Sequence, residues 1–301
     1  MRKRVAAMVL LLVCAGVAVQ GEAVFSMVLR AYFGLHGIHG KRIVRGGDTV
    51  FLFEGGPRDG RTVLLLHGVG GNALTSWFRL MPDLARQYRV IAPDMFFANL
   101  PDLVGSGYGI DLENRLVDML FDNLDVERAS IVGLSFGAWP ALRAAADHPE
   151  RVDRVVLVSP LGGKADQVLE GLDLDPDDPG RDFHYRIFSS PPPVPSLFLR
   201  PHWDRTTRVF RALPHFLDQL AVEGERLEAA MPRVQCPVLI VCGEQDRIMG
   251  RELFRDMAGQ LPHGSLLELE GSGHAVVWDR ADALAGVVTD FLGQEADGHA
   301  Q

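Results

Sequence analysis

Short runs of β-branched and other apolar residues alternate along most of the sequence with segments whose apolar residues recur every three or four positions. Runs such as "TVLLLH", "RVVLVS" and "PVLIVCG" are typical of strands buried on both faces. This alternation predicts a mostly parallel, doubly wound sheet of the α/β class. Strands are expected at Thr49–Glu54, Thr62–His67, Arg89–Pro93, Ala129–Gly133, Val152–Ser159, Pro237–Gly243 and Ser265–Leu269. Helices are expected at Leu74–Gln87, Leu112–Leu124, Ser135–Asp147, Arg251–Gln260 and Arg280–Leu292.

The alternation stops between Leu161 and Pro232 and resumes at Cys236. The intervening residues include the acidic run "LDLDPDDPGRD", the run "SSPPPVPS" and large apolar residues such as Trp203 and Phe210. An insertion of this kind between two strands of one sheet favours a helical lid over the strand ends. The predicted organisation is a core over residues 24–160 and 233–294, a lid over 161–232 and a disordered tail over 295–301.

Composition and charge argue against some classes of function. The 301 residues carry a formal net charge of −9, and 47% of them are hydrophobic. No basic face of the kind that neutralises nucleic-acid phosphates is apparent, so no nucleic-acid partner is expected. The acidic run lacks the ligand spacing and glycine of a calcium loop, and we interpret it as a solvated loop. No cluster has metal-ligand spacing, so neither a metal nor a cofactor is expected.

The first residues have the pattern of a targeting segment. The basic residues of "MRKR" precede an uncharged apolar stretch, Val5–Val19. This pattern predicts a secretory signal peptide over residues 1–23, cleaved after Gly21 or Ala23. The alternatives are an uncleaved membrane anchor and a buried N-terminal helix. The protein is therefore expected to be exported, periplasmic or secreted, or anchored to the membrane through this segment.

Two of the three cysteines, Cys236 and Cys242, lie in the strand-like run "CPVLIVCG". Six residues along a strand span about 20 Å, whereas a disulfide requires Cα atoms within about 7 Å of each other. Free thiols that pack as small apolar groups are therefore expected at both positions.

The stretch "IVGLSFGAW" places Ser135 two residues from a glycine on each side. The predicted strand "ASIVG" precedes this serine, and the helix-like "FGAWPALRAAADH" follows it. A sharp strand-to-helix turn strains the serine backbone, and Gly133 and Gly137 relieve the crowding because they lack Cβ. This context favours a nucleophile elbow over a glycine-rich turn without chemistry.

A nucleophilic serine needs a base, and the base needs an acid to orient it. Asp246 follows the strand that comes after the predicted lid, and Glu244 is a rival acid one position past that strand. His274 lies in the loop "GSGHAVVW" after the last predicted strand. The chain order Ser135, Asp246, His274 is the order found in α/β-hydrolases, so we predict a triad of these three residues.

An oxyanion hole requires two preorganised donors. The backbone N–H of Phe136, directly after the nucleophile, is one candidate. The second is the N–H of Val69 in "HGVGG", where Gly70 and Gly71 permit a tight turn. The alternative for "HGVGG" is a flexible turn without this role.

These features together resemble the α/β-hydrolase superfamily, and most closely its bacterial lipase, esterase and C–C hydrolase branch. The resemblance covers about residues 49 to 292 and implies Ser135 as nucleophile, Asp246 as acid, His274 as base, and Val69 and Phe136 as oxyanion donors. The matching stretches are "LLLHGVGGNALTSW", "YRVIAPD", "VERASIVGLSFGAWPALRAAADHPERVDRVVLVSP", "CPVLIVCGEQD" and "EGSGHAVVWDRADALAGVVTDFL".

One segment departs from the pattern of that superfamily. Its members usually continue after the residue that aligns with Asp94 with a glycine-rich turn, whereas this chain reads "DMFFANLPDLVGSGYG". One hypothesis is that Phe96 or Phe97 lines an acyl pocket. The alternative is that both phenylalanines only pack under the lid.

The predicted function is hydrolysis of carboxylic esters through an acyl-enzyme, as in a lipase or carboxylesterase. The aromatic and aliphatic residues of the predicted lid favour a small-molecule, apolar ester as the substrate. C–C bond or thioester hydrolysis on the same triad is the alternative, because the triad does not select the substrate. A non-catalytic binding protein of this fold is disfavoured because all three triad positions are present.

Overall fold

A computed structural model of the protein describes residues 23–45, 48–106, 108–162, 173–191 and 196–294. The predicted leader, apart from residue 23, and the predicted tail lie outside these residues. The described chain forms an eight-stranded sheet in the order β1-β2-β4-β3-β5-β6-β7-β8. β1 and β2 pair antiparallel, as do β2 and β4, and every other pairing is parallel. The predicted α/β-hydrolase fold with a mostly parallel sheet is confirmed. The strands are β1 (His39–Arg45), β2 (Asp48–Gly55), β3 (Thr62–Leu66), β4 (Arg89–Pro93), β5 (Ala129–Leu134), β6 (Val152–Val158), β7 (Val238–Gly243) and β8 (Gly264–Leu269).

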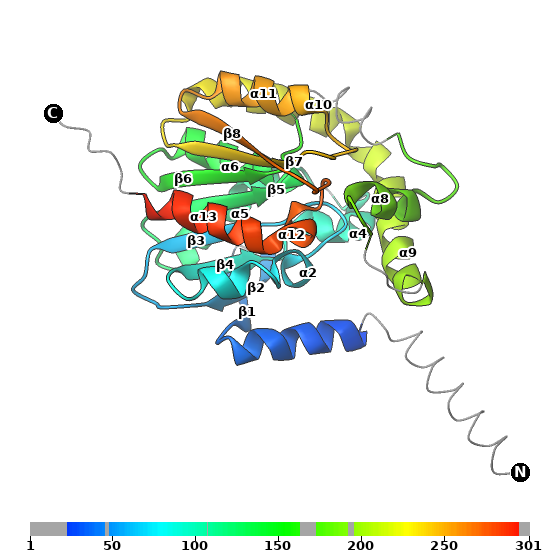
Figure 1. Ribbon diagram of the computed structural model, residues 1–301, viewed down its shortest axis with the longest axis horizontal. Coiled ribbons are helices and arrows are strands. Elements are labelled where there is room, and N and C mark those ends of the chain that lie inside the picture. The colour runs from blue at the N-terminus through cyan, green and yellow to red at the C-terminus, as the bar shows by residue number, and fades with distance from the viewer. Residues whose placement is uncertain (1–22, 46–47, 107, 163–172, 192–195, 295–301) are drawn as a thin grey trace, which may run out of the picture.

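Both faces of the sheet are buried, as the continuous apolar runs predict. In β3, Val63 and Leu65 pack into one hydrophobic cluster, while Leu64 and Leu66 pack into the other, because successive strand side chains point to opposite faces. On the Val63 face lie the N-terminal helix (residues 23–35), α2 (Ala73–Trp77), α3 (Met81–Leu84), α12 (Val276–Asp279) and α13 (Ala281–Gly293). On the Leu64 face lie α5 (Asp111–Asn123), α6 (Ala138–Asp147), α10 (Leu217–Ala230) and α11 (Arg251–Gln260). Figure 1 shows α12 and α13 in front of the sheet, with α5 and α6 behind it.

The seven predicted strands agree with the structure to within one residue at each end, but β1 was not predicted. Its sequence "HGKRIVR" is mostly polar because β1 is an edge strand, paired only with β2. Its outer residues therefore need no apolar pattern. The helix over residues 23–35 was not predicted either, and the alternative of a helical leader concerns residues that lie outside the described part of the chain.

The predicted helix Leu74–Gln87 is wrong, because the structure has two short helices there, α2 and α3. Asn72 caps α2 by accepting from the backbone N–H of Thr75 at 2.9 Å. Pro82 lies in the first turn of α3, where a missing N–H costs no helical hydrogen bond. Continuation of α2 through this proline would instead lose such a bond.

The insertion between β6 and β7 is helical in its described part. It contains α8 (Pro179–Ile187), α9 (Ser196–Ala212), the 3-10 turn η3 (Leu213–Phe216), α10 and the 3-10 turn η4 (Met231–Arg233). α8 packs on α9, whereas α10 packs on α6 of the core. Figure 1 shows α8 and α9 together at one end of the molecule, beyond the sheet.

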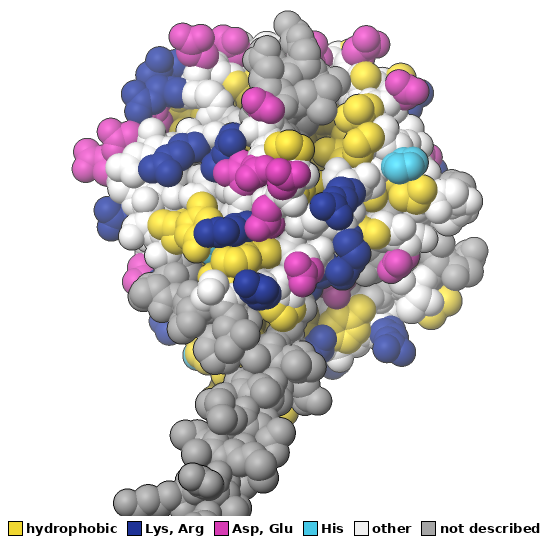
Figure 2. Space-filling model, turned by 90° about the vertical axis from the view of Figure 1, so that its right-hand side faces the viewer, with side chains coloured by type: hydrophobic (Ala, Val, Ile, Leu, Met, Phe, Trp, Pro, Cys, Tyr) yellow, Lys and Arg dark blue, Asp and Glu magenta, His cyan; other side chains and the backbone are white. Residues whose placement is uncertain are grey.

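The surface around α8 and α9 is mixed in character. Figure 2 views the side that carries α8 and α9, where apolar side chains lie among charged ones of both signs. In the described part of the chain, no helix is long and apolar enough to cross a membrane.

The two cysteines of the described chain, Cys236 and Cys242, are buried free thiols. Burial raises their pKa values to about 11 and about 12.

Candidate active site

Ser135 lies in a strained turn at the carboxyl end of β5. Its backbone is left-handed, with φ +51°, and the 3-10 turn η2 (Ser135–Gly137) joins β5 to α6. A Cβ at Gly133 would lie 2.5 Å from the carbonyl oxygen of Gly137. A Cβ at Gly137 would collide with the carbonyl oxygen of Leu66 in β3. Both glycines are therefore needed for the strand, turn and helix to approach this closely.

The structure brings the three predicted triad residues together. The Nε2 atom of His274 lies 3.0 Å from the Oγ of Ser135. The Nδ1 atom of the same ring lies 2.8 Å from Oδ2 of Asp246. All three side chains are buried, so bulk water competes little for these bonds. The rival acid, Glu244, is exposed and takes no part in this chain of hydrogen bonds.

The carboxylate of Asp246 is held from two sides. Its Oδ1 accepts the backbone N–H groups of Ile248 at 2.8 Å and Met249 at 3.0 Å. Its Oδ2 remains for His274. The carboxylate therefore has a fixed orientation, which is what an acid must have to select the tautomer of a catalytic histidine.

The loop that carries His274 is tied to the insertion. The N–H of Ala275 donates to the carbonyl oxygen of Ile187 at 2.7 Å. Oδ2 of Asp279 accepts from Gly273 N–H at 2.7 Å and from Ser189 N–H at 2.9 Å. The end of α8 thus helps to position the histidine, a contact that spans more than 80 residues of sequence.

The two predicted oxyanion donors, Val69 and Phe136, line the same pocket as Ser135 and His274. Val69 lies in a turn closed by a bond from Gly71 N–H to the carbonyl oxygen of Gly68. Gly70 has φ +79°, a conformation that glycine adopts at little cost. The assignment of both amides to an oxyanion hole stays a prediction.

His67, which the sequence analysis did not identify, supports this turn through two hydrogen bonds. Its Nε2 accepts the N–H of Met95 at 3.0 Å, so its proton is on Nδ1, which donates to the carbonyl oxygen of Gly68 at 2.9 Å. Burial lowers the pKa of His67 and keeps the ring neutral. The side chain joins the loop after β3 to the loop after β4.

Glu113 on α5 is a second residue that sequence reasoning missed. Its carboxylate accepts the N–H groups of Phe96 at 3.1 Å and Phe97 at 2.6 Å, and the hydroxyl of Tyr108 at 2.7 Å. Burial raises the pKa of Glu113 to about 7 despite these three donors. Burial and the adjacent carboxyl raise the pKa of Tyr108 as well. Glu113 thus fixes the unusual "MFFANLP" segment to the core.

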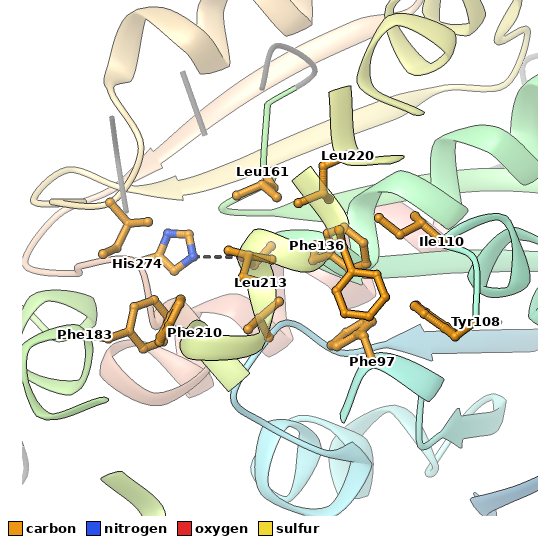
Figure 3. Close-up of a pocket in the computed structure, with 14 residues that line it drawn as sticks. Phe97, Tyr108, Ile110, Phe136, Leu161, Phe183, Phe210, Leu213, Leu220 and His274 are labelled. Atoms are coloured by element: carbon orange, nitrogen blue, oxygen red, sulfur yellow. Dashed lines mark hydrogen bonds between the residues drawn. The ribbon is translucent and has the colours of Figure 1, made fainter. Parts of the chain in front are cut away.

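The pocket beside Ser135 is apolar (Figure 3). Apart from Ser135 and His274, Tyr108 is the one described lining residue with a polar side chain, and its hydroxyl is engaged by Glu113. Phe97 lines the pocket, whereas Phe96 packs against the core cluster. The remaining lining residues are Val69, Ile110, Phe136, Leu161, Phe183, Phe210, Leu213, Phe216, Leu220 and Ile248.

The charged groups of the described residues do not assemble into a metal site. No group of three His, Cys, Asp or Glu side chains in that part of the chain is placed to hold a metal ion.

Comparison with known families supplies the classification. Residues 63–287, well over half of the chain, match the alpha/beta hydrolase family. The chain belongs to this family. The positions of Ser135 after β5, Asp246 after β7 and His274 after β8 fit that membership. The protein is a hydrolase of the α/β-hydrolase fold.

Individual relatives are similar at modest identity. A 2-hydroxymuconate semialdehyde hydrolase of a Pseudomonas species is 29% identical over 276 residues, covering 86% of this chain and 95% of that protein. A 2-hydroxy-6-oxononadienedioate/2-hydroxy-6-oxononatrienedioate hydrolase of Cupriavidus pinatubonensis is 25% identical over 272 residues, covering 83% of this chain and 93% of that protein. The crystal structure of a bacterial membrane phospholipase A has the same fold, with a TM-score of 0.77 at 24% identity, covering 97% of this chain and 98% of that one.

The roles of the two acidic residues after β7 can be separated by mutation. Asp246→Asn keeps the shape of the side chain but removes the charge that orients His274, so the rate at which a fluorophosphonate probe labels Ser135 should fall on the order of 10⁴-fold. Glu244→Gln, an exposed neighbour, serves as the matched control and should label at the rate of the unchanged protein. Equal losses in both variants would contradict the assignment.

Glu113 should make stability depend on pH. Its pKa is about 7 in the folded protein against 4.5 for the free side chain, so the folded state binds the proton more tightly. This stabilisation is full below pH 4.5 and is lost as the pH rises through 7. Glu113→Gln should therefore flatten the fall in the free energy of unfolding across this window by on the order of 3 kcal/mol, measured by urea denaturation.

The control for this measurement is Glu54→Gln. Glu54 pairs with Lys41 and Arg89, and those bonds lower its pKa despite partial burial. Glu54 therefore titrates below the pH range in which Glu113 loses its proton. The Glu54→Gln variant should keep the pH dependence of the unchanged protein. A fall that is as steep in Glu113→Gln as in Glu54→Gln would rule out Glu113 as the source.

Proposed function

We propose that this hydrolase cleaves carboxylic esters with an uncharged, apolar acyl group through an acyl-enzyme on Ser135. The observation that carries the proposal is the composition of the pocket beside the triad. None of its described lining residues is Lys, Arg, Asp or Glu. A carboxylate-bearing substrate would lose its hydration there without gaining a cationic partner, whereas an alkyl chain gains by burial.

Acylation begins at the serine hydroxyl. The Oγ of Ser135 attacks the ester carbonyl carbon while Nε2 of His274, 3.0 Å away, takes its proton. Asp246 stabilises the imidazolium through the 2.8 Å bond to Nδ1. The N–H groups of Val69 and Phe136 donate to the oxyanion, and losing one such donor costs about 3 to 4 kcal/mol of barrier.

Collapse of the tetrahedral intermediate expels the alcohol, which takes the proton back from His274. Water then repeats the sequence on the acyl-enzyme, with His274 as the base. The acid product leaves and the Ser135 hydroxyl is restored.

The insertion acts as the lid in this proposal. The pocket is lined by Ser135 and His274 and, from the insertion, by Phe183, Phe210, Leu213, Phe216 and Leu220. In Figure 3, Leu213 lies between the His274 side of the pocket and the side formed by Phe97, Tyr108 and Ile110. An apolar acyl chain on the Phe97 side would be covered by both the core and the lid.

C–C bond hydrolysis is the second candidate, and the names of the curated relatives agree better with it than with ester hydrolysis. Those relatives are named for 2-hydroxymuconate semialdehyde and for oxononadienedioate or oxononatrienedioate substrates. Such substrates carry carboxylates. The apolar described lining of this pocket favours an uncharged ester instead.

We further propose that the protein is exported or membrane-anchored through its N-terminal segment. The support is the basic "MRKR" followed by the apolar stretch Val5–Val19. At a membrane the enzyme would meet apolar esters, which are the substrates that its apolar pocket favours.

A substrate panel separates the two candidate reactions. The unchanged protein should hydrolyse p-nitrophenyl esters with kcat/KM rising about fourfold per added methylene, since each buried methylene contributes about 0.8 kcal/mol. It should leave 2-hydroxymuconate semialdehyde largely intact, as measured by the absorbance of that compound. Ser135→Ala should lose the ester activity. Faster turnover of the semialdehyde than of any ester would overturn the proposal in favour of C–C hydrolysis.

The two adjacent phenylalanines provide a matched pair for the acyl pocket. Phe97 lines the pocket and contacts the ring of Phe136 at 4.8 Å between centroids, whereas Phe96 lies outside the lining. Phe97→Ala should enlarge the pocket and move the preferred ester toward longer acyl chains. Phe96→Ala should leave the preference unchanged. The same chain-length profile in both variants would exclude Phe97 from the acyl pocket.

A further inference from the structure

The N-terminal helix (residues 23–35) is apolar on the side that faces away from the protein. Leu29 and Phe33 are buried against the sheet, with 5% and 0% of their surface exposed. Six large apolar side chains of the same helix are nevertheless exposed. Those exposed are Val24 (39%), Phe25 (42%), Met27 (64%), Val28 (55%), Tyr32 (38%) and Leu35 (86%).

The spacing of these residues forms one face. Val24, Met27, Val28, Tyr32 and Leu35 follow one another at intervals of three, four or one residues, so they lie on the same side of a helix with 3.6 residues per turn. This side is opposite to the one that carries Leu29 and Phe33. The solvent side of a surface helix is ordinarily polar, so an apolar outer face indicates a partner.

The position of the helix leaves that face open. Figure 1 shows the helix at the lower edge of the molecule, with the rest of the described chain on one side of it only. Its first residues lie toward the end of the molecule that carries α8 and α9 (Figure 1). A surface that binds the helix would therefore approach the molecule near the proposed lid.

The local charge suits an anionic surface. Residues 23–47 contain no Asp or Glu but contain Arg30, Lys41, Arg42 and Arg45, although the whole chain has a net charge of −9. Lys41 is paired with Glu54, whereas Arg30 and Arg42 are exposed on this part of the molecule. Cations beside an apolar helical face are the combination that binds anionic lipid.

The residues before the helix have the pattern of a membrane-targeting segment. The apolar stretch Val5–Val19 is separated from residue 23 by three residues, which span at most about 10 Å. If that stretch enters a bilayer, during export or as a retained anchor, the helix begins at the lipid surface.

A second copy of the chain fits this face less well. A helix of 13 residues is about 20 Å long and about 10 Å wide, so its outer face offers roughly 200 Å². A stable interface needs about 800 Å² on each partner. Binding to a lipid surface instead scales with the buried apolar area of a single helix together with its attraction to anionic headgroups.

We propose that the N-terminal helix is an interfacial helix, which lies on an anionic lipid surface through Val24, Met27, Val28, Tyr32 and Leu35. Tyr32 suits the headgroup region because its ring is apolar and its hydroxyl is polar. The proposal concerns where the protein sits and does not depend on which bond the triad cleaves. It also holds whether the leader is removed or retained.

A fluorescent probe on the helix tests the proposal in the full chain. Leu35→Cys, in a Cys14→Ser background, is labelled with an environment-sensitive fluorophore, and Val222→Cys on α10, a 47% exposed position, is the matched control. Cys236 and Cys242 stay unlabelled because they are buried and their thiol pKa values are raised to about 11 and about 12. On phosphatidylglycerol-containing vesicles, emission at position 35 should shift to shorter wavelength, and emission at position 222 should not.

Three results would overturn the proposal. Vesicle sedimentation of the chain without a shift at position 35 would show that the leader alone binds lipid. A shift without vesicles that grows with protein concentration would show that a second copy covers the face. A concentration-independent shift already present without vesicles would show that the chain's own N-terminal residues cover it.

Discussion

Ser135 adopts a left-handed backbone, with φ +51°, where β5 turns into α6. A residue other than glycine adopts the left-handed conformation only at a cost in free energy. Here the surrounding backbone holds Ser135 in that conformation. Gly133 and Gly137 let the strand, the turn and β3 approach so closely that a Cβ at either position would meet a carbonyl oxygen. The same packing that joins sheet and helix therefore raises the serine hydroxyl above the strand ends, where the other site residues converge.

Convergence follows from the parallel sheet, because the loops after β3, β4, β5, β7 and β8 all leave from one edge. Buried polar side chains then hold these loops at fixed distances. His67 joins the loops after β3 and β4, and Glu113 fixes the segment after β4 to α5. Asp246 joins the loops after β7 and β8 through His274. Each of these side chains is fully bonded, as burial requires.

The pocket and the outer face of the N-terminal helix are both apolar, and the same physical effect acts on both. Each surface gains by leaving water for a hydrocarbon environment. The pocket offers that environment to an acyl chain, while the outer face of the helix would enter the edge of a bilayer. The insertion contributes to the first of these, since Phe183, Phe210 and Leu220 all line the pocket.

The sequence by itself determined the parallel core, the family and the candidates Ser135, Asp246 and His274, because strand periodicity, glycine spacing and chain order are local properties. Only the tertiary structure shows that Asp246, and not its neighbour Glu244, contacts His274, and that Phe97 lines the pocket. It also revealed Glu113, whose partners include residues 16 and 17 positions away. These choices depend on which way a side chain turns at a strand end and on which distant donors meet it. Packing in three dimensions sets both, and no local pattern encodes them.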